Sequence, residues 1–468
     1  MIQTDMRTTG TRIGPGEARL DESCSPGVEA VAGAFERFAA GATVGEPAWL
    51  NPIRKSGLAR FADLGYPTTG HEDWRYTNVA AVPRLPFIPS LAVGGEGFTG
   101  NLAELAPLGA LDGDLVVLVD GVFSASLSRL TPGGALVQPL SAALKAGGEV
   151  AGWLRESFGN TAEATDAFGA LNDAFFTDGL VLRIPEGRTD SPVVNLVHVA
   201  TGGTQGASHH VRNLIVAGAR SRVTVFESYV GVSGRAYVTN AVTDVVVGEE
   251  SVVEFGRYQD EAMEAFHLGT LRATLGRGGR LVAHSIALGG KLSRQSIRTK
   301  LDGEGVEAVL NGLYVAHCDQ LMDHHMVVDH AKPHCASHEY FNGVLGGRSR
   351  GVFHGRILVR KDAQKTDAKQ TNKNLLLSDD AEVDTKPQLE IYADDVKCTH
   401  GATIGQMNPE SIFYLRARGI GEATARRMLV HAFAGEIIDR IECAPVRELL
   451  DRNAWDRLEV HDLLASAP

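Results

Sequence analysis

The feature of the sequence that most constrains its fold is a strand–turn–strand pattern that recurs between residues 181 and 406. Short apolar runs such as NLIVAGARSRVTVFESY and TDVVVGEESVVEFGRY are interrupted by turns of glycine and charged residues. The turn glycines Gly218, Gly248, Gly278 and Gly305 follow one another at spacings of 30, 30 and 27 residues. A period of about 20–50 residues is typical of a solenoid. With no helix between the strands, we expect a mainly β fold, either a β-helix or an irregular stacked β-sandwich.

The two flanks of this core differ from it in pattern. We divide the chain into a disordered N-terminal arm (1–26), an N-terminal helical region (27–95), a mixed α/β connecting region (96–180), the β-helix core (181–406) and a C-terminal helical region (407–468). In the N-terminal region, Asn51 can cap a helix with Pro52 at its first position. The pair Asn408-Pro409 predicts another helix start. The last coil of such a core exposes a sheet edge, which predicts a dimer or heterodimer through the end coils.

Composition excludes several classes of function. The chain has 468 residues and a formal charge of -12 with both signs interspersed, whereas a nucleic-acid binder would show a basic stripe. No apolar run reaches the ~18 residues needed to span a membrane, and the first 27 residues lack the apolar segment of a secretory signal. The five cysteines are widely spaced without a C-x-x-C pair, which fits a reducing cytoplasm. The G-x-x-x-x-G-K-[ST] loop is missing, so we expect this chain to bind no nucleotide and hydrolyse no ATP.

Residues 317–338 are rich in potential metal ligands. They include His317, His324, His325, His330, His334 and His338, together with Cys318 and Cys335. Imidazole and thiolate bind zinc and iron, but the spacings match no closed zinc site. Strand alternation puts Asp323 and His325 on one face and His324 on the other. The pattern favours hydrogen-bonded histidines on polar strands over a metal site.

Two shorter segments also carry reactive side chains. In HEDWRYTN, the His/Glu/Asp group beside Trp74 could form a site, but the segment is more typical of an aromatic anchor that docks the N-terminal helical region on the core, and we favour the anchor. In VKCTHGATIGQ, alternation places Cys398, His400 and Ile404 on one face, and Lys397 with the threonines on the other. We expect the first face to be buried, against the protein or a partner. Two donors are too few for a complete metal site, and taken alone the pair is more typical of packing residues.

The C-terminal helical segment GEATARRMLVHAFAGEIIDRI has apolar residues at helical spacing. The predicted stripe consists of Ala425, Met428, Leu429, Ala432 and Phe433, extended by Ile437, Ile438 and Ile441. Packing on the chain's own core is the simpler interpretation. Docking of a partner is the alternative.

Four segments together resemble one known family. They are HEDWRYT, the run DHAKPHCASHEYFNGVLGGRSRGVFHGRILV, the run from Ala363 to Gln406, and FYLRARGI. They resemble the SufB/SufD family of iron–sulfur cluster assembly proteins over about residues 35–90 and 165–445. The tryptophan segment and the single Cys-x-His followed by Gly401 favour the SufD branch.

This resemblance implies a right-handed parallel β-helix between helical regions, acting as a non-catalytic cytoplasmic scaffold. A SufD-type chain pairs with SufB through the β-helices, and each binds the ATPase SufC through its C-terminal helices. The resemblance implies that His400, with Cys398 beside it, holds a transient iron–sulfur cluster at the SufB interface. The residues expected to dock SufC are Phe413, Tyr414, Met428, Leu429 and Phe433. The helix GEATARRMLVHAF lacks the acidic run of SufB, so no carboxylate ligand is carried over.

Two other functions stay open. One is a stand-alone metal-dependent enzyme on a β-helix, with the histidines of 317–338 activating water. The other is a purely structural β-helix that organises partners without a ligand role. A homodimer of the isolated chain is a further expectation.

Overall fold

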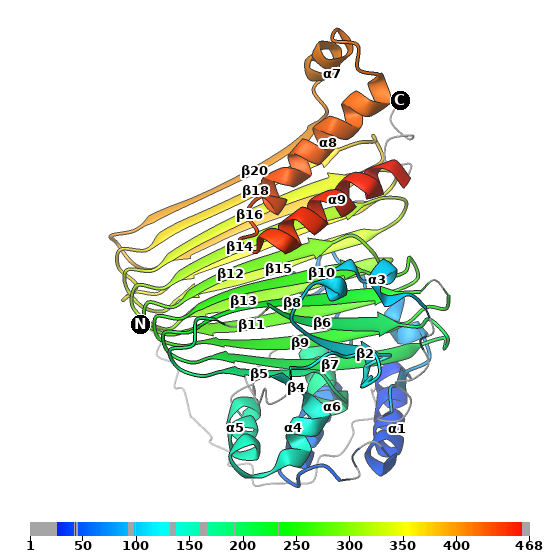
Figure 1. The fold of residues 1–468 in the computed structure, drawn as a ribbon, viewed down its shortest axis with the longest axis vertical. Coiled ribbons are helices and arrows are strands. Elements are labelled where there is room, and N and C mark those ends of the chain that lie inside the picture. The colour runs from blue at the N-terminus through cyan, green and yellow to red at the C-terminus, as the bar shows by residue number, and fades with distance from the viewer. Residues whose placement is uncertain are drawn as a thin grey trace, which may run out of the picture.

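The centre of the molecule is a parallel β-solenoid with helices at both flanks (Figure 1). The computed structural model describes residues 26–460 except 42, 44, 92–97, 99, 132–136, 160–165, 191–192 and 233. The predicted disordered arm therefore lies outside the described residues except for Pro26, and so does Cys24.

Each coil of the solenoid contributes one strand to each of two sheets. The first sheet contains β5 (Leu180–Ile184), β7 (Ala207–Ala217), β9 (Val238–Val247), β11 (Phe266–Leu275), β13 (Leu292–Leu301), β15 (Leu321–His330), β17 (Arg350–Val359) and β19 (Glu382–Ile391). The second contains β6 (Val193–Ala200), β8 (Arg222–Gly231), β10 (Val252–Asp260), β12 (Arg280–Ala287), β14 (Glu307–Ala316), β16 (Ala336–Leu345), β18 (Asp367–Leu376) and β20 (Lys397–Gln406). Every strand from β7 onward pairs in parallel with the strand two positions before it. The expected β-helix is confirmed.

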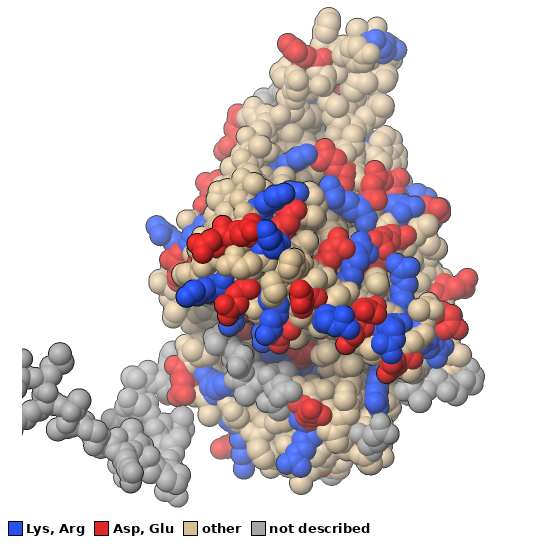
Figure 2. Space-filling model, turned by 90° about the vertical axis from the view of Figure 1, so that its left-hand side faces the viewer, with Lys and Arg blue, Asp and Glu red and all other residues tan. Residues whose placement is uncertain are grey.

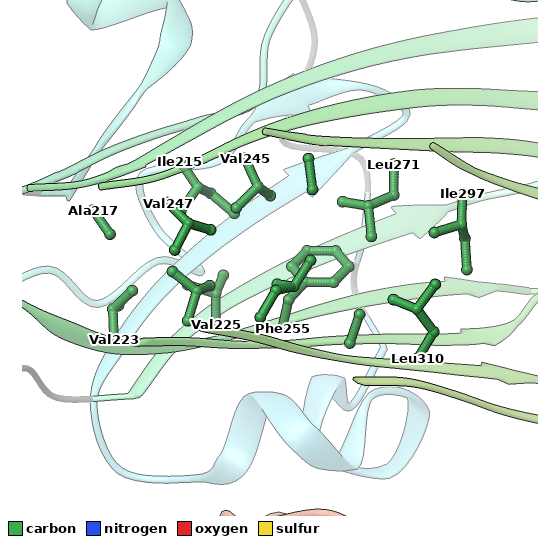
Figure 3. Close-up of a cluster of buried hydrophobic side chains, with 14 of the residues drawn as sticks. Ile215, Ala217, Val223, Val225, Val245, Val247, Phe255, Leu271, Ile297 and Leu310 are labelled. Atoms are coloured by element: carbon green, nitrogen blue, oxygen red, sulfur yellow. The ribbon is translucent and has the colours of Figure 1, made fainter. Parts of the chain in front are cut away.

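Apolar side chains from the two sheets meet inside the solenoid (Figure 3). Alternate residues of each strand point inward, and the parallel register stacks equivalent positions, as Val225 on Phe255 and Ile215 on Val245. These side chains are almost completely removed from water. Their burial supplies the main stabilisation of the stack.

The periodic turn glycines stack along one corner of the solenoid for two different physical reasons. Gly278 and Gly305 adopt positive φ angles of 63° and 70°, which favour glycine. Gly218 and Gly248 instead pass close to the preceding coil, where an added Cβ would lie 2.7 Å from Glu186 N and 2.6 Å from Ala217 O respectively. The spacing of about 30 residues is thus the length of one coil.

Charged side chains of both signs cover this corner, which faces the viewer in Figure 2. Exposed ion pairs join consecutive coils, for example Arg220 with Glu186 and Lys365 with Asp395. Exposed pairs of this kind contribute little stability each. On the face shown in Figure 2, basic and acidic side chains alternate, so this face carries no basic stripe.

The N-terminal helices cover the outer face of the first sheet at its early coils. α1 (Pro26–Gly41), α2 (Leu50–Leu64) and α6 (Ala167–Phe175) share a core with Val238 and Phe266. The predicted cap is wrong, because α2 already begins at Leu50, whose buried side chain anchors the first turn. Asn51 and Pro52 lie inside that turn, and Trp49 occupies the N-cap position.

Shorter elements connect these helices to the solenoid. They are the 3₁₀ helices η1 (Glu72–Trp74), η2 (Val82–Arg84) and η3 (Pro107–Ala110), the helices α3 (Leu102–Leu105), α4 (Leu140–Ala146) and α5 (Gly148–Gly159), and the strands β1 (Ile88–Pro89), β2 (Asp114–Val119), β3 (Val122–Phe123) and β4 (Val137–Pro139).

The C-terminal helices α7 (Pro409–Arg416), α8 (Glu422–Ile438) and α9 (Ala444–Val460) follow the last strand. Asn408 caps α7 as predicted, its side chain accepting from Glu410 N. α8 and α9 pack on the outer face of the second sheet. None of the described helices is long and apolar enough to cross a membrane.

The predicted stripe of α8 is only partly right. Ala425 and the isoleucines are buried, but Met428 and Ala432 are exposed, whereas Val430 and Ala434 face the sheet. The buried face is rotated relative to the predicted one. Apolar residues occupy several faces of this helix, so spacing alone did not select the correct one.

Candidate functional site

The C-terminal end of the solenoid is open. Among the described residues, β19 pairs only with β17 and β20 only with β18. Each strand is 10 residues long and has one edge that no other strand covers. Ile404 and Tyr392 expose large apolar side chains here. Such an edge is a template for strand addition by another chain.

His400 lies on β20 and faces the interior of the solenoid. It extends an inward ladder of Leu310, Glu339 and Gln370, which are in register on successive strands and are buried. His400 is nevertheless exposed in the isolated chain, so its expected burial would require a partner and stays a prediction. It is exposed because β20 is the last strand of its sheet and no further described coil covers it.

Cys398 lies on the same face, one step closer to the turn corner. It is half-buried against the cluster that contains Ala368 and Ile357. Burial, with a smaller contribution from Asp367, raises the pKa of the Cys398 thiol above its usual range. The thiol is therefore protonated at neutral pH, and a bound metal would be needed to ionise it.

Behind His400 lies a buried pair of polar side chains. Gln370 Nε2 donates to Glu339 Oε2 over 2.7 Å. Burial raises the pKa of Glu339 to about 7. Gly355, on the opposite sheet, leaves the space that Gln370 fills, since an added Cβ there would lie 2.1 Å from Gln370 Nε2.

Neither residue of this pair is among the site residues predicted from the sequence, although the spacing of the coils points to both. Gln370 precedes His400 by 30 residues and Glu339 precedes Gln370 by 31, which is the spacing of one coil. Residues about one coil length before His400 lie in register with it on the preceding strands, and this spacing leads to Gln370 and then to Glu339.

The donors at the open end can bind a metal but cannot complete its coordination. Residues two apart on a strand have Cα atoms ~6.5–7 Å apart, close enough for both side chains to reach one cluster. A thiolate and an imidazole suit iron and zinc. Tetrahedral coordination needs about four ligands, so two would have to come from elsewhere.

The histidine-rich segment 317–338 does not form one site. His324 faces the interior and bonds Ser285 Oγ at 2.9 Å, while His330 bonds Ser337 Oγ at 2.8 Å. His325 points to the opposite face, as predicted, and His334 is exposed in a turn. Burial lowers the pKa of His324 to about 3 and that of His330 to about 4. These two are neutral core histidines, in line with the favoured interpretation.

The segment HEDWRYTN acts as the predicted anchor. Trp74 is buried, and Arg294 of β13 lies over its ring at 3.9 Å. Thr77 Oγ1 donates to Asp323 Oδ2 over 2.6 Å. Asp73, which directly precedes Trp74, comes close to His325 and His354 of the first sheet. No local sequence pattern predicts that these three residues meet, because they come from distant parts of the chain.

The candidate docking residues of the C-terminal helices differ in exposure. Phe413 and Tyr414 on α7 are 74% and 57% exposed, and Met428 on α8 is 38% exposed. Leu429 and Phe433 are partly buried, and Phe433 packs against the core shared with the second sheet. The surface available to a partner is therefore mainly that of α7.

Comparison with known proteins identifies the family. A family model described as SUF system FeS cluster assembly, SufBD core domain, matches residues 198–433. A second, described as SufBD protein N-terminal region, matches residues 34–194. This chain belongs to the SufBD family of iron–sulfur cluster assembly proteins. The two matches meet near the start of β6, so together they span the N-terminal region, the solenoid and most of α8.

Individual relatives match over most of their length. The SufD protein of Escherichia coli is 30% identical over 393 residues, covering 84% of this chain and 89% of the relative. An iron–sulfur cluster assembly SufBD family protein of Synechocystis is 29% identical, covering 84% and 88%. The SufD protein of Bacillus subtilis is 26% identical, covering 86% and 93%. The SufD-like resemblance of the sequence is confirmed.

Proposed function

We propose that this chain is a scaffold subunit of a SUF-type complex that builds and hands on nascent iron–sulfur clusters. In this proposal its open solenoid end pairs with the end of a SufB chain, and its C-terminal helices carry the ATPase SufC. The chain itself is non-catalytic and works in the cytoplasm. The observation that carries the proposal is the exposure of His400, an inward-facing residue left uncovered at an unpaired sheet edge.

The nascent cluster is the cargo of this site. Pairing of a second solenoid end onto β20 would cover the interior face of the last coil and remove His400 from water. His400 and Cys398 would supply one nitrogen and one sulfur donor, and the partner would supply the others. A site shared by two chains can release its cluster when the interface opens, which suits a scaffold. Movement driven by SufC would provide that opening.

The test is co-expression of the chain with SufB and SufC, followed by measurement of iron and acid-labile sulfide in the purified complex. His400→Ala should lower both at least ~10-fold, because the lost nitrogen donor leaves the cluster incompletely coordinated. Cys398→Ala should lower them by a smaller factor, because its half-buried thiol is harder to ionise.

The matched control is Thr399→Ala, which changes the residue between them on the other face of β20. It should retain cluster formation, and all variants should retain complex assembly on size-exclusion chromatography. A His400→Ala complex that carries as much iron and sulfide as wild type would refute the ligand role.

Docking of SufC is tested on α7. The double substitution Phe413→Ala/Tyr414→Ala removes the two most exposed aromatic side chains of this helix and should abolish co-purification of SufC. Glu448→Ala, at an exposed position of α9, is the control and should retain SufC. Equal recovery of SufC with both variants would show that SufC binds elsewhere.

A further inference from the structure

A cluster of metal-ligand donors lies on the outer face of the first sheet. His325 of β15 and His354 of β17 are neighbours in register, with ring centroids 4.3 Å apart and ring planes at 74°. Asp73 Oδ1, from η1, lies 3.7 Å from His325 Nε2. One ligand atom from each of the three residues lies within 4.8 Å of the others, which occurs in no other group among the described residues.

The two neighbours of Asp73 in η1, Glu72 and Trp74, hold its carboxylate in place. Trp74 stacks under Arg294 of β13, and Glu72 pairs with Lys386 of β19. Asp73 therefore lies over the two strands between them, β15 and β17. The segment crosses four strands and presents its middle side chain to the two imidazoles.

The imidazoles have unused ligand atoms. His354 Nε2 is buried and has no hydrogen-bond partner within the described chain, and the His325 atom that lies beside Asp73 is Nε2. Gln388 forms a side-chain hydrogen bond with His354, the kind of second contact that orients a metal-binding imidazole. Both rings are buried, whereas Asp73 is 49% exposed, so an ion can reach the cluster from solvent.

We propose that Asp73, His325 and His354 bind a divalent transition-metal ion, such as zinc, that fastens the N-terminal segment to the solenoid. Two imidazoles and one carboxylate form a familiar donor set for zinc and for ferrous iron. Tetrahedral zinc, with ligands at ~2.1 Å, has its ligand atoms roughly 3.4 Å apart. Small side-chain rotations would bring the donors to that separation, and water would complete the coordination.

The surrounding charges limit the affinity. Arg294 is paired with Asp323, and Lys386 with Glu72. Arg298 of β13 also faces His325 and repels a cation. We therefore expect micromolar affinity and a role in fastening the segment, separate from the cluster chemistry at His400.

The test uses the full chain with Cys398→Ala and His400→Ala, so that the open end cannot bind the probe. Zinc is titrated against a chromophoric chelator, and thermal unfolding is followed with and without zinc. This double variant, the background for all further substitutions, should bind one zinc ion and should unfold at a higher temperature when zinc is present. Asp73→Asn and His354→Asn should each weaken binding at least ~10-fold and remove the thermal shift.

His71→Asn is the control, because His71 is an exposed ligand-type residue of the same segment that lies outside the cluster. It should bind zinc like the background. Asp73→Asn is the more decisive variant, since its exposed side chain can change without disturbing the core. Unchanged zinc affinity in Asp73→Asn and His354→Asn, or no zinc binding in the background, would overturn the proposal.

Discussion

The two ends of the solenoid are built from the same two sheets but finish differently. At the N-terminal end the first sheet ends in β4, antiparallel to β5, and the second ends in the antiparallel pair β2 and β3. Helices α4 and α6 gather at this end (Figure 1). At the C-terminal end, no further described strand pairs with β19 or β20. The chain completes one end with its own residues, whereas no further described strand covers the other end.

The same difference appears in the burial of the strands. In β9 every residue except Val246 is buried, and in β20 all but the half-buried Cys398 are exposed. An inward position is therefore buried core near the N-terminal end and exposed at the last coil, where we propose an interface. Substitutions at inward positions of the two regions should separate stability from assembly.

The largest expected effect comes from placing a carboxylate at an inward position of each region. Val245→Asp would bury a charge in the apolar interior, and we expect a loss of about 4 kcal/mol or more, or failure to fold. Ile404→Asp should change the free energy of unfolding by less than ~1 kcal/mol, because Ile404 is exposed. It should instead abolish pairing with SufB, since the charge would be buried on assembly. Urea unfolding and co-purification measure the two effects.

The proper comparison for Ile404→Asp is Thr399→Ala, on the other face of the same strand, which should still pair. If Ile404→Asp destabilised the isolated chain as strongly as Val245→Asp, the last coil would be part of the stabilising core and the proposed difference between the two ends would be refuted.

These regions also differ in how well their sequence predicted them. The spacing of the turn glycines predicted the solenoid because every coil must return over the one before it, so both positive φ angles and close backbone contacts recur with the coil length. Alternation correctly predicted that His324 and His325 point apart, and that Cys398 and His400 lie on one face of their strand. These are local consequences of strand geometry.

The missed features depend on what lies beyond the strand. Alternation gives the direction of His400 but not whether another coil covers it. The position of Asp73 near His325 and His354 depends on how η1 crosses the first sheet, which no local pattern encodes. The buried face of α8 depends on its packing against the second sheet, and its several apolar faces left that undecided.

The second-largest expected effect is a pH dependence of stability that comes from Glu339. This residue lies two strands from the open edge and is fully buried. Its pKa is raised to about 7, so the fold favours the protonated carboxyl. The associated stability is fully present below the unfolded-state pKa of about 4.5 and is lost as the pH rises through about 7. The loss amounts to roughly 3 kcal/mol at most. Urea unfolding of wild type from pH 5 to pH 8 should show this decline.

Glu339→Gln should remove the decline, because the amide does not ionise, and should be the more stable protein at pH 8. Glu382→Gln, at an exposed carboxylate of β19, is the control and should retain the wild-type pH dependence. Identical pH profiles for Glu339→Gln and wild type would show that Glu339 is ionised within the fold at neutral pH.

The smallest expected effect comes from replacing strand glycines with alanine, and it differs between Gly355 and Gly401. Gly355→Ala places a methyl group 2.1 Å from Gln370 Nε2, so Gln370 must move and lose its bond to Glu339. We expect a loss of ~1–3 kcal/mol in the free energy of unfolding. Gly401→Ala, on the open edge, has no atom within 4 Å of the added carbon and should be neutral or stabilising by up to ~1 kcal/mol.

Combining Gly355→Ala with Gln370→Ala identifies the cause. Shortening Gln370 makes room for the methyl group, so the double variant should lose less than the sum of the two single variants. Additive losses would mean that Gly355 is required for another reason than the space it leaves for Gln370. In that case the stacked side chains behind His400 would not depend on the contact between Gly355 of the first sheet and Gln370 of the second. The two sheets would then pack less tightly in the last coils than in the early ones.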